Sequence, residues 1–95
     1  MFQKDKPDRN PKYLRWVKSQ LCVVSAMPAD DPHHLIGHGM GGMGTKVSDY
    51  LTFPLTRLEH SALHQRGWRE WESQYDSQWR HVTMTLLRAI REGAL

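Results

Sequence analysis

The residues of this 95-residue chain that could do chemistry are histidines, gathered in two short motifs on either side of a glycine-rich segment. His33 and His34 are adjacent, whereas His60 and His64 are four residues apart. Neutral imidazole nitrogens bind divalent metals, and two histidines one helical turn apart lie on one face of a helix. The spacing therefore predicts one metal site formed by His33, His60 and His64.

His33 and His34 are expected to have different roles, because neighbouring residues of a strand point to opposite faces. We interpret His33 as a metal ligand and His34 as a general base that faces the substrate. A divalent ion, Zn²⁺ or Mg²⁺, beside a base provides what phosphodiester hydrolysis needs: a nucleophilic water, a proton acceptor and positive charge at the phosphate. The pattern thus predicts a metal-dependent endonuclease.

Two other hypotheses use the same residues. A catalytically silent DNA- or protein-binding module would use the histidines to hold a structural zinc with four protein ligands, and His38 is the candidate for the fourth. An RNase on the same scaffold is the third hypothesis, because the sequence does not distinguish DNA from RNA as the substrate.

A hairpin and a helix must position the histidines. His33–Ile36 and Tyr50–Leu55 are predicted as strands, separated by a glycine-rich loop whose residues lack the constraint of a Cβ atom. A helix is predicted from Thr56 to Gln65, because Thr56 is a favoured N-cap and Glu59 completes a capping box. His60 and His64 then share one face of this helix.

The remaining elements are predicted from their apolar patterns. Tyr13–Lys18 fits a packed helical turn, and Leu21–Val24 is typical of a short buried strand. From Trp68 to Ile90 the apolar residues recur close to every 3.6 positions, which predicts one long amphipathic helix or two that meet near Asp76. The fold class is therefore α+β, a hairpin plus helix followed by a C-terminal amphipathic helix or helices.

Composition limits the setting of this domain. The chain has 13 Lys and Arg against 10 Asp and Glu, a net charge of +3, which favours a polyanionic partner. A single cysteine, Cys22, excludes an intramolecular disulfide. The sequence has no apolar run of membrane-spanning length and no hydrophobic signal core, so we expect a cytoplasmic protein without a membrane partner.

Basic residues occur both at the N-terminus and around the predicted site. Residues 1–12 are polar, with two prolines and several cations, and are predicted to be a flexible basic arm before a domain at 13–95. The cations that flank the histidine motifs in sequence are predicted to contact nucleic-acid phosphates: Lys46, Arg57, Arg66 and Arg69.

The histidine motifs also resemble a known superfamily. The pair His33–His34, the hairpin, and the segment Glu59–Gly67 resemble the ββα-metal (HNH) nucleases, and the arrangement of histidines is most similar to that of the colicin DNases. The runs His33–Gly39 and Met43–Lys46, with Pro54–Leu55, are more closely similar to a phage and prophage family related to a recombination-enhancement nuclease. This resemblance, which covers roughly residues 13–95, implies DNA as the substrate, a role in phage recombination or replication, and a host recombinase such as RecA as a partner.

The resemblance implies roles residue by residue. It places metal ligands at His33, His60 and His64, the water-activating base at His34, and phosphate contacts at Lys46 and Arg66. Asp49 stands where many HNH enzymes have an asparagine that orients the base. An aspartate there would raise the basicity of His34 if the two hydrogen-bond.

One departure from the superfamily concerns a second metal. Many HNH relatives have two Cys-x-x-Cys pairs that bind a structural zinc beside the hairpin, and the matching positions here are Cys22, Ser25, Thr56 and Glu59. With one cysteine, a four-thiolate zinc site cannot form. We therefore expect packing by the tryptophans of the C-terminal segment to anchor the helix.

Overall fold

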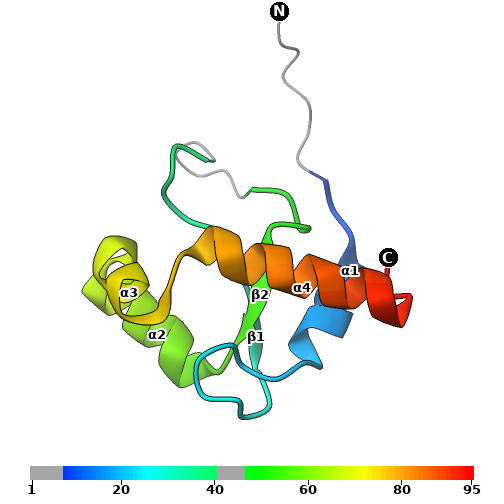
Figure 1. Cartoon of the computed structure of the whole chain (residues 1–95), viewed down its shortest axis with the longest axis horizontal. Coiled ribbons are helices and arrows are strands. Elements are labelled where there is room, and N and C mark those ends of the chain that lie inside the picture. Colours follow the sequence, from blue (N-terminus) through cyan, green and yellow to red (C-terminus); the bar gives the residue numbers. More distant parts are fainter. Residues whose placement is uncertain (1–7, 41–46) are drawn as a thin grey trace, which may run out of the picture.

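The computed structural model describes residues 8–40 and 47–95, and these form an α+β domain (Figure 1). The elements in chain order are α1 (Pro11–Lys18), β1 (Asp31–His34), β2 (Thr52–Leu55), α2 (Arg57–Arg66), α3 (Trp68–Tyr75) and α4 (Gln78–Glu92). The predicted fold class, an antiparallel hairpin followed by a helix and C-terminal amphipathic helices, is confirmed.

The hairpin pairs β1 with β2 so that His33 lies opposite Phe53 and Pro32 lies opposite Pro54. Because proline has no N–H, a register that sets two prolines against each other loses no cross-strand hydrogen bond between them. The first strand has the predicted length but begins and ends two residues earlier, at Asp31 and His34, and the second is shorter than predicted because it begins at Thr52 instead of Tyr50.

Turns on both sides of the long loop explain these shifts. After β1, Gly37, His38 and Gly39 all have positive φ, which ends the extended conformation. Before β2, the chain turns at Asp49, whose carbonyl accepts a hydrogen bond from the Thr52 hydroxyl at 2.9 Å. The sequence pattern shows the apolar residues on either side of these turns but not where the pairing stops.

The boundaries of α2 agree with the predicted capping box. The Thr56 hydroxyl accepts a hydrogen bond from the Glu59 N–H at 3.3 Å, and Gly67 ends the helix with φ 89°. The helix therefore starts directly after β2, and this short connection fixes its first turn against the end of the hairpin.

The C-terminal segment forms two helices that meet at Asp76. Of the two predicted alternatives, one long helix or two helices, the second is therefore confirmed. Asp76 has φ 79°, which breaks the helical path after Tyr75. The Ser77 hydroxyl then caps α4 by accepting from the Trp79 N–H, and Gly93 ends α4 in the left-handed conformation.

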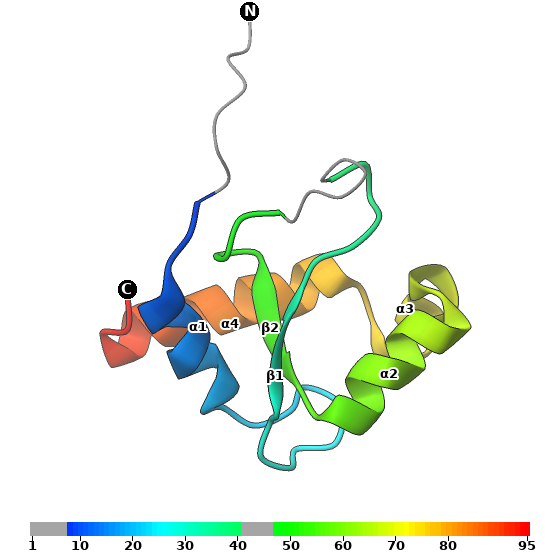
Figure 2. The same cartoon turned by 180° about the vertical axis from the view of Figure 1, so that it is seen from behind.

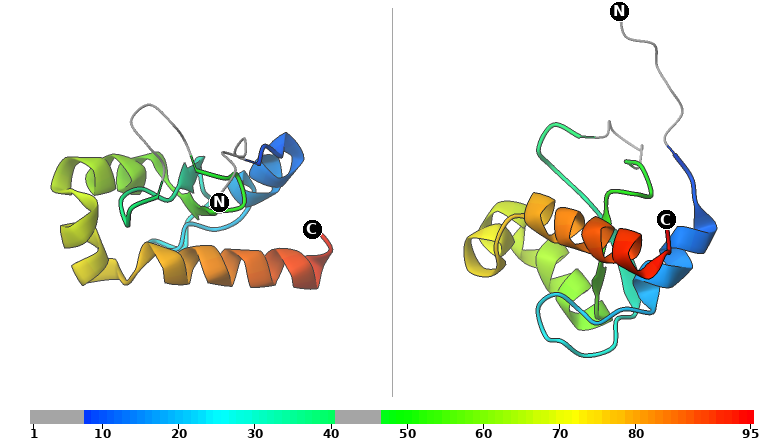
Figure 3. Two further views of the ribbon diagram at one scale, coloured as in Figure 1. Left: turned by 90° about the horizontal axis from the view of Figure 1, so that it is seen from above. Right: turned by 45° about the vertical axis from the view of Figure 1, so that its right-hand side comes forward.

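The domain has two layers, with α4 beneath the hairpin, α1 and α2, and α3 connects the two layers at one side (Figure 3). Seen from behind, the hairpin lies between α1 and α2 (Figure 2). All of β2 is buried, and its Phe53 and Leu55 pack in a core that also contains Leu63 of α2, Trp71 of α3 and Val82 of α4. A smaller cluster joins α1 to the end of α4 through Tyr13, Val17 and Ala89. The expected anchoring of α2 by a C-terminal tryptophan is confirmed for Trp71.

Two predicted features near the N-terminus are wrong. Leu21–Val24 is not a strand, because only Leu21 makes a bridge, to Pro28, and the residues between them turn. Residues 8–12, predicted to belong to a flexible arm, are part of the fold. Asn10 caps α1 by accepting from the Tyr13 N–H, and Pro11 is the first helical residue. Residues 1–7 lie outside the described residues.

Among the helices of the described part of the chain, none combines the length and apolar character needed to cross a membrane.

Candidate metal centre and adjacent histidine–aspartate pair

The hairpin and α2 bring His33, His60 and His64 together. His33 is on β1, and the other two lie one turn apart on α2, which follows β2 directly. One ligand atom from each lies within 4.8 Å of the others. The predicted convergence of the three side chains is therefore confirmed, and the described residues contribute no fourth histidine, cysteine or carboxylate to the group.

His33 is the buried member of this group. Its side chain packs edge-on against Phe53 and the residue is 1% exposed. Its pKa is lowered to about 3, chiefly by burial and also by the neighbouring His60 and His64, against the opposing effect of a hydrogen bond with Gln78. His33 is therefore neutral at physiological pH, the form that can donate a lone pair to a metal.

His60 is oriented by a carboxylate from the first residue of β1. Its Nδ1 lies 3.1 Å from Asp31 Oδ2, and Asp31 also accepts from Arg57 at 3.1 Å. Partial burial alone would raise the pKa of Asp31, but the hydrogen bonds from Arg57 and His60 outweigh it and hold the pKa below its ordinary value. An ionised Asp31 can only accept, so His60 carries its proton on Nδ1 and presents Nε2.

These observations fit a divalent metal. Metal-binding histidines usually donate their other ring N–H to a carboxylate or carbonyl, and here Asp31 serves His60 while the side-chain carbonyl of Gln78 serves His33. The third residue, His64, is the most exposed of the group, and its pKa is lowered by burial and by His60. Three neutral imidazoles with a further position open are the ligand set of several catalytic zinc sites.

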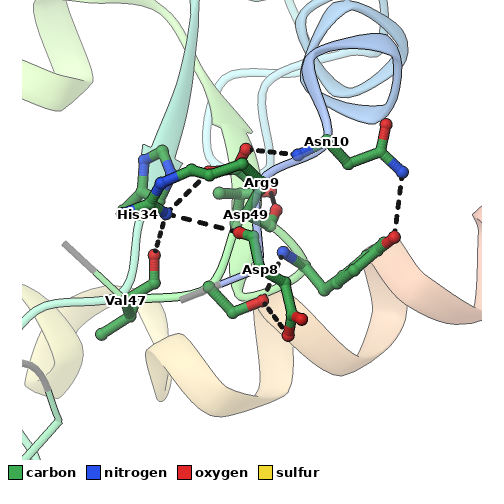
Figure 4. A network of polar contacts seen from close by, with 9 residues as sticks. Asp8, Arg9, Asn10, His34, Val47 and Asp49 are labelled. Carbon is green, nitrogen blue, oxygen red and sulfur yellow. Dashed lines mark hydrogen bonds and ion pairs between the residues drawn. The ribbon is translucent and has the colours of Figure 1, made fainter. Parts of the chain in front are cut away.

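His34 lies beside this group and has a different partner. Its Nε2 is 2.8 Å from Asp49 Oδ1, so the predicted hydrogen bond between them is present (Figure 4). Partial burial alone would raise the pKa of Asp49, but hydrogen bonds from His34 and from the Asn10 N–H outweigh it, and the net pKa is lowered. Because an ionised carboxylate accepts, the His34 proton is on Nε2, which leaves Nδ1 able to take up a proton.

The segment before α1 holds Asp49 in place. The Asn10 N–H donates to Asp49 Oδ2 at 2.7 Å, and Arg9 reaches Oδ1 at 3.3 Å (Figure 4). Arg9 also donates to the Val47 carbonyl at 2.9 Å, while the Asp49 N–H donates to the Asp8 carbonyl at 2.9 Å. Asp49 itself is 3% exposed. Residues 8–10 therefore fix the carboxylate that orients His34.

The histidines line one hollow of about 500 Å³. Its lining residues come from α1, β1 and the loop after it, and α2: Leu14, Asp31, Pro32, His33, His34, Ile36, His60 and His64. A hollow of this size is in the range of sites that hold small molecules or parts of larger ones. His34 therefore faces the same space as His33, His60 and His64, although the side chains of His33 and His34 leave β1 on opposite sides.

The structure places the cations predicted to contact phosphate as follows. Arg57 is exposed and paired with Asp31 at the edge of the hollow. Arg66 donates to Gln74 of α3, and Arg69 stacks over the Trp68 ring at 4.6 Å, so neither lines the hollow. Lys46 lies outside the described residues.

His38, the predicted candidate for a fourth ligand, is not part of the group. The positive-φ turn at Gly37–Gly39 carries His38 over Trp68, where its Nε2 pairs with Glu72 at 2.6 Å. Gly37 packs so closely on Trp68 that a Cβ atom would overlap the indole ring. The turn therefore directs His38 to α3 and away from the three converging histidines.

Some of the positions that the sequence resemblance matched to a structural zinc of HNH nucleases also lie close together. Cys22 and Thr56 approach to 4.0 Å between Sγ and Oγ1, and Glu59 is the residue whose N–H the Thr56 hydroxyl caps. Cys22 belongs to the apolar core with Trp71. A thiol and a hydroxyl in this place act as packing and capping groups.

The sequence interpretation missed Asp31, Gln78 and the Arg9–Asn10 pair. Asn10 followed by proline is a helix-start signal that could have moved the domain boundary. Asp31 lies two residues before His33, so strand alternation puts both on one face. Gln78 gave no such signal, because its contact with His33 joins residues 45 positions apart.

The fold and the site define a small α+β domain that presents a three-histidine cluster in metal-binding geometry. The chain belongs to the family described as Protein of unknown function (DUF968), which matches residues 2–93. It is 50% identical over 84 residues, 88% of this chain, to the uncharacterized protein YdfU of Escherichia coli (strain K12), and it spans 24% of the length of that relative. No solved structure matches the chain.

Proposed function

We propose that this protein is a metal-dependent endonuclease that hydrolyses DNA phosphodiester bonds. The observation that carries the proposal is that one hollow contains both a three-histidine group in metal-binding geometry and a histidine oriented by a buried carboxylate. The resemblance of the histidine motifs to HNH nucleases supports the same class of activity.

In this proposal His34 is the general base. Its Nε2–H is engaged by Asp49, so Nδ1 accepts the proton of the water that attacks the phosphorus. Asp49 orients the ring and stabilises the positive charge that the ring gains, and Arg9 and Asn10 keep Asp49 from turning away. This division of work resembles the base and orienting carboxylate of other hydrolases.

His33, His60 and His64 would hold the ion. When bound, a divalent ion would supply positive charge to the phosphate and to the leaving oxygen. Burial of His33 keeps its ring neutral, and the contact with Asp31 holds the His60 ring in one orientation. The chain thus provides the ligands on one wall of the hollow and the base on the neighbouring wall.

The charges on α1 support a nucleic-acid substrate. Leu14 lines the hollow, and Lys12, Arg15 and Lys18 of the same helix are exposed. Within the part of the chain that the structure describes, these three cations form no ion pair, whereas Arg57 is paired with Asp31. Unpaired cations beside the hollow are available to a phosphate backbone. We infer that α1, together with Arg57, guides DNA into the site.

The wider role follows the resemblance. We propose a part in phage or prophage recombination or replication in the host cytoplasm, with a recombinase such as RecA as the partner to test first. A pull-down with RecA on single-stranded DNA, compared with the DNA alone, addresses this part separately from cleavage.

A cleavage assay tests the proposed activity. Supercoiled plasmid, single-stranded DNA and RNA would each be incubated with the protein and Mg²⁺, Mn²⁺ or Zn²⁺, with EDTA as the control. We expect nicked or linear DNA with at least one metal and none with EDTA. Tight zinc binding without cleavage of any substrate would support the non-catalytic module instead, and cleavage of RNA alone would support the RNase.

A further inference from the structure

Gln78 is the first residue of α4, fully buried, and in contact with His33 across the two layers of the domain. Its Oε1 lies 3.0 Å from His33 Nε2. A buried amide is costly unless its hydrogen-bonding atoms are satisfied, and this one is satisfied on both sides. The contact is therefore built into the core of the protein.

The neighbours of Gln78 determine which way its amide points. The Nε2 group donates to the Ile36 carbonyl at 2.9 Å and to Glu72 Oε2 at 3.2 Å, both of which can only accept. Oε1 accepts from the Ile36 N–H at 3.2 Å, which can only donate. If the amide were turned over, its oxygen would face the Ile36 carbonyl and the Glu72 carboxylate, and its NH₂ group would face the Ile36 N–H.

The fixed amide determines the tautomer of His33. Since Oε1 can only accept, His33 must carry its proton on Nε2, and Nδ1 is left with the lone pair. We propose that Gln78 is a positioning residue of the metal centre, which makes Nδ1 of His33 the ligand atom. This inference rests on the metal site of the proposed function, but not on cleavage.

Glu72 and His38 extend this contact to the surface. Glu72 Oε2 accepts from the backbone N–H of Gln78 at 3.1 Å as well as from its side chain, and His38 Nε2 pairs with the same oxygen at 2.6 Å. Burial alone would raise the pKa of Glu72, but hydrogen bonds from His38 and Gln78 outweigh it and the net pKa is lowered. An ionised Glu72 holds the Gln78 N–H₂ group, so the chain His38–Glu72–Gln78 ends on His33.

Nitrogen NMR of the metal-free protein tests the tautomer directly. Correlation of the ring protons with ¹⁵N distinguishes a protonated from an unprotonated ring nitrogen, and we expect the His33 proton on Nε2. This measurement requires no variant, so it remains informative if substitution of Gln78 prevents folding. A wild-type His33 that carries its proton on Nδ1 would overturn the proposal.

Gln78→Met and its matched control Gln74→Met then test the effect on metal binding. Gln74 is an exposed glutamine on α3 whose side chain accepts from Arg66 and has no other hydrogen-bond partner among residues 8–40 and 47–95. We expect Gln78→Met to give a mixture of His33 tautomers and to lower Zn²⁺ affinity about 10–100-fold by calorimetry, with an altered Co²⁺ spectrum. The control, Gln74→Met, should match the wild type in its His33 tautomer, its Zn²⁺ affinity and its Co²⁺ spectrum.

The outcomes separate this proposal from the proposed function. If Gln78→Met keeps the wild-type His33 tautomer and Zn²⁺ affinity, Gln78 does not position the metal centre. If the wild-type protein binds neither Zn²⁺ nor Co²⁺, the assignment of Nδ1 as a ligand fails. If the metal binds as expected and no nucleic acid is cleaved, the nuclease fails while the role of Gln78 stands.

Discussion

His33 and His34 are chemically identical neighbours whose surroundings give them different roles. His33 is buried against Phe53 and Gln78, whereas His34 lies partly exposed at the hollow with Asp49 behind it. Burial keeps the first ring neutral, as the proposed metal ligand requires, and the carboxylate orients the second ring, the proposed general base. At the residue scale, the role of a histidine is set by the group that its second nitrogen contacts.

His34→Ala is predicted to abolish cleavage and to preserve metal binding. Loss of a general base typically lowers the rate about 10²–10⁴-fold, while the three-histidine group remains intact. His60→Ala should instead lower metal affinity together with the metal-dependent rise in melting temperature, because binding contributes to folding. Melting curves with and without metal, beside a cleavage assay, compare the two variants. If His34→Ala loses that rise, His34 is itself a ligand.

The metal-free protein is predicted to lose stability as the pH falls from neutral towards 5. The unfolded chain protonates His33 near the ordinary histidine pKa of 6.5, whereas burial lowers the pKa of the folded residue to about 3. The unfolded state therefore binds more protons in this window, and the free energy of unfolding falls as pH is lowered, by at most about 1.4 kcal/mol per pH unit. Urea titrations in EDTA at roughly pH 7 and 5 measure the free energy of unfolding at each pH. His33→Gln should flatten the dependence, and an equal slope in that variant would contradict the prediction.

At the element scale, α1 connects the two halves of the site. Leu14 lines the hollow, and Tyr13 and Val17 pack against the end of α4. The segment that precedes the helix holds Asp49, while the helix itself presents its cations to solvent. The segment before α1 thus holds the carboxylate that orients His34, the proposed base, and α1 itself borders the hollow where we propose that DNA binds.

Neutralising two cations of α1 is predicted to weaken DNA binding and its salt dependence. Arg15→Gln/Lys18→Gln removes two phosphate contacts, so the slope of log K against log salt should decrease by about 1.8 for a duplex. The matched control is Arg88→Gln/Arg91→Gln on α4, whose residues do not line the hollow. Fluorescence anisotropy with a labelled duplex across a range of salt concentrations measures both. Equal slopes for the two variants would show that α1 is not the DNA-binding element.

For the whole molecule, a metal would add a link between the hairpin and α2 to the core contacts that already join them. The hairpin contributes one ligand and α2 contributes two, so one ion would link β1 to α2 across the hollow. Domains of this length bury a modest core, and a bound metal adds stability in proportion to its affinity.

Saturating metal is predicted to raise the melting temperature substantially. Ligand at 100 times its dissociation constant adds about 2.7 kcal/mol, which corresponds to roughly 10–20 °C for a domain of this size. Differential scanning calorimetry with Zn²⁺ or Mg²⁺, then with excess EDTA, provides the comparison. His64→Ala should show a much smaller shift. A wild-type melting temperature that neither ion changes would argue against a metal centre.

The sequence alone determined the fold class, the helix α2 and the three converging histidines. The capping box at Thr56 and the four-residue spacing of His60 and His64 are local, so they could be predicted from neighbouring residues. The α+β class followed from the same local patterns, since apolar period and turn residues reflect the backbone of each segment.

Only the tertiary structure decided which groups support those histidines. Asp49 accepts hydrogen bonds from Arg9 and Asn10, which lie about 40 positions away in the sequence, and His33 hydrogen-bonds with Gln78, 45 positions away. No periodicity along the chain could reveal either contact. The turn that carries His38 onto Trp68 depends on the close approach of Gly37 to that ring. Such contacts arise when separate elements pack together, and packing is a property of the folded chain as a whole.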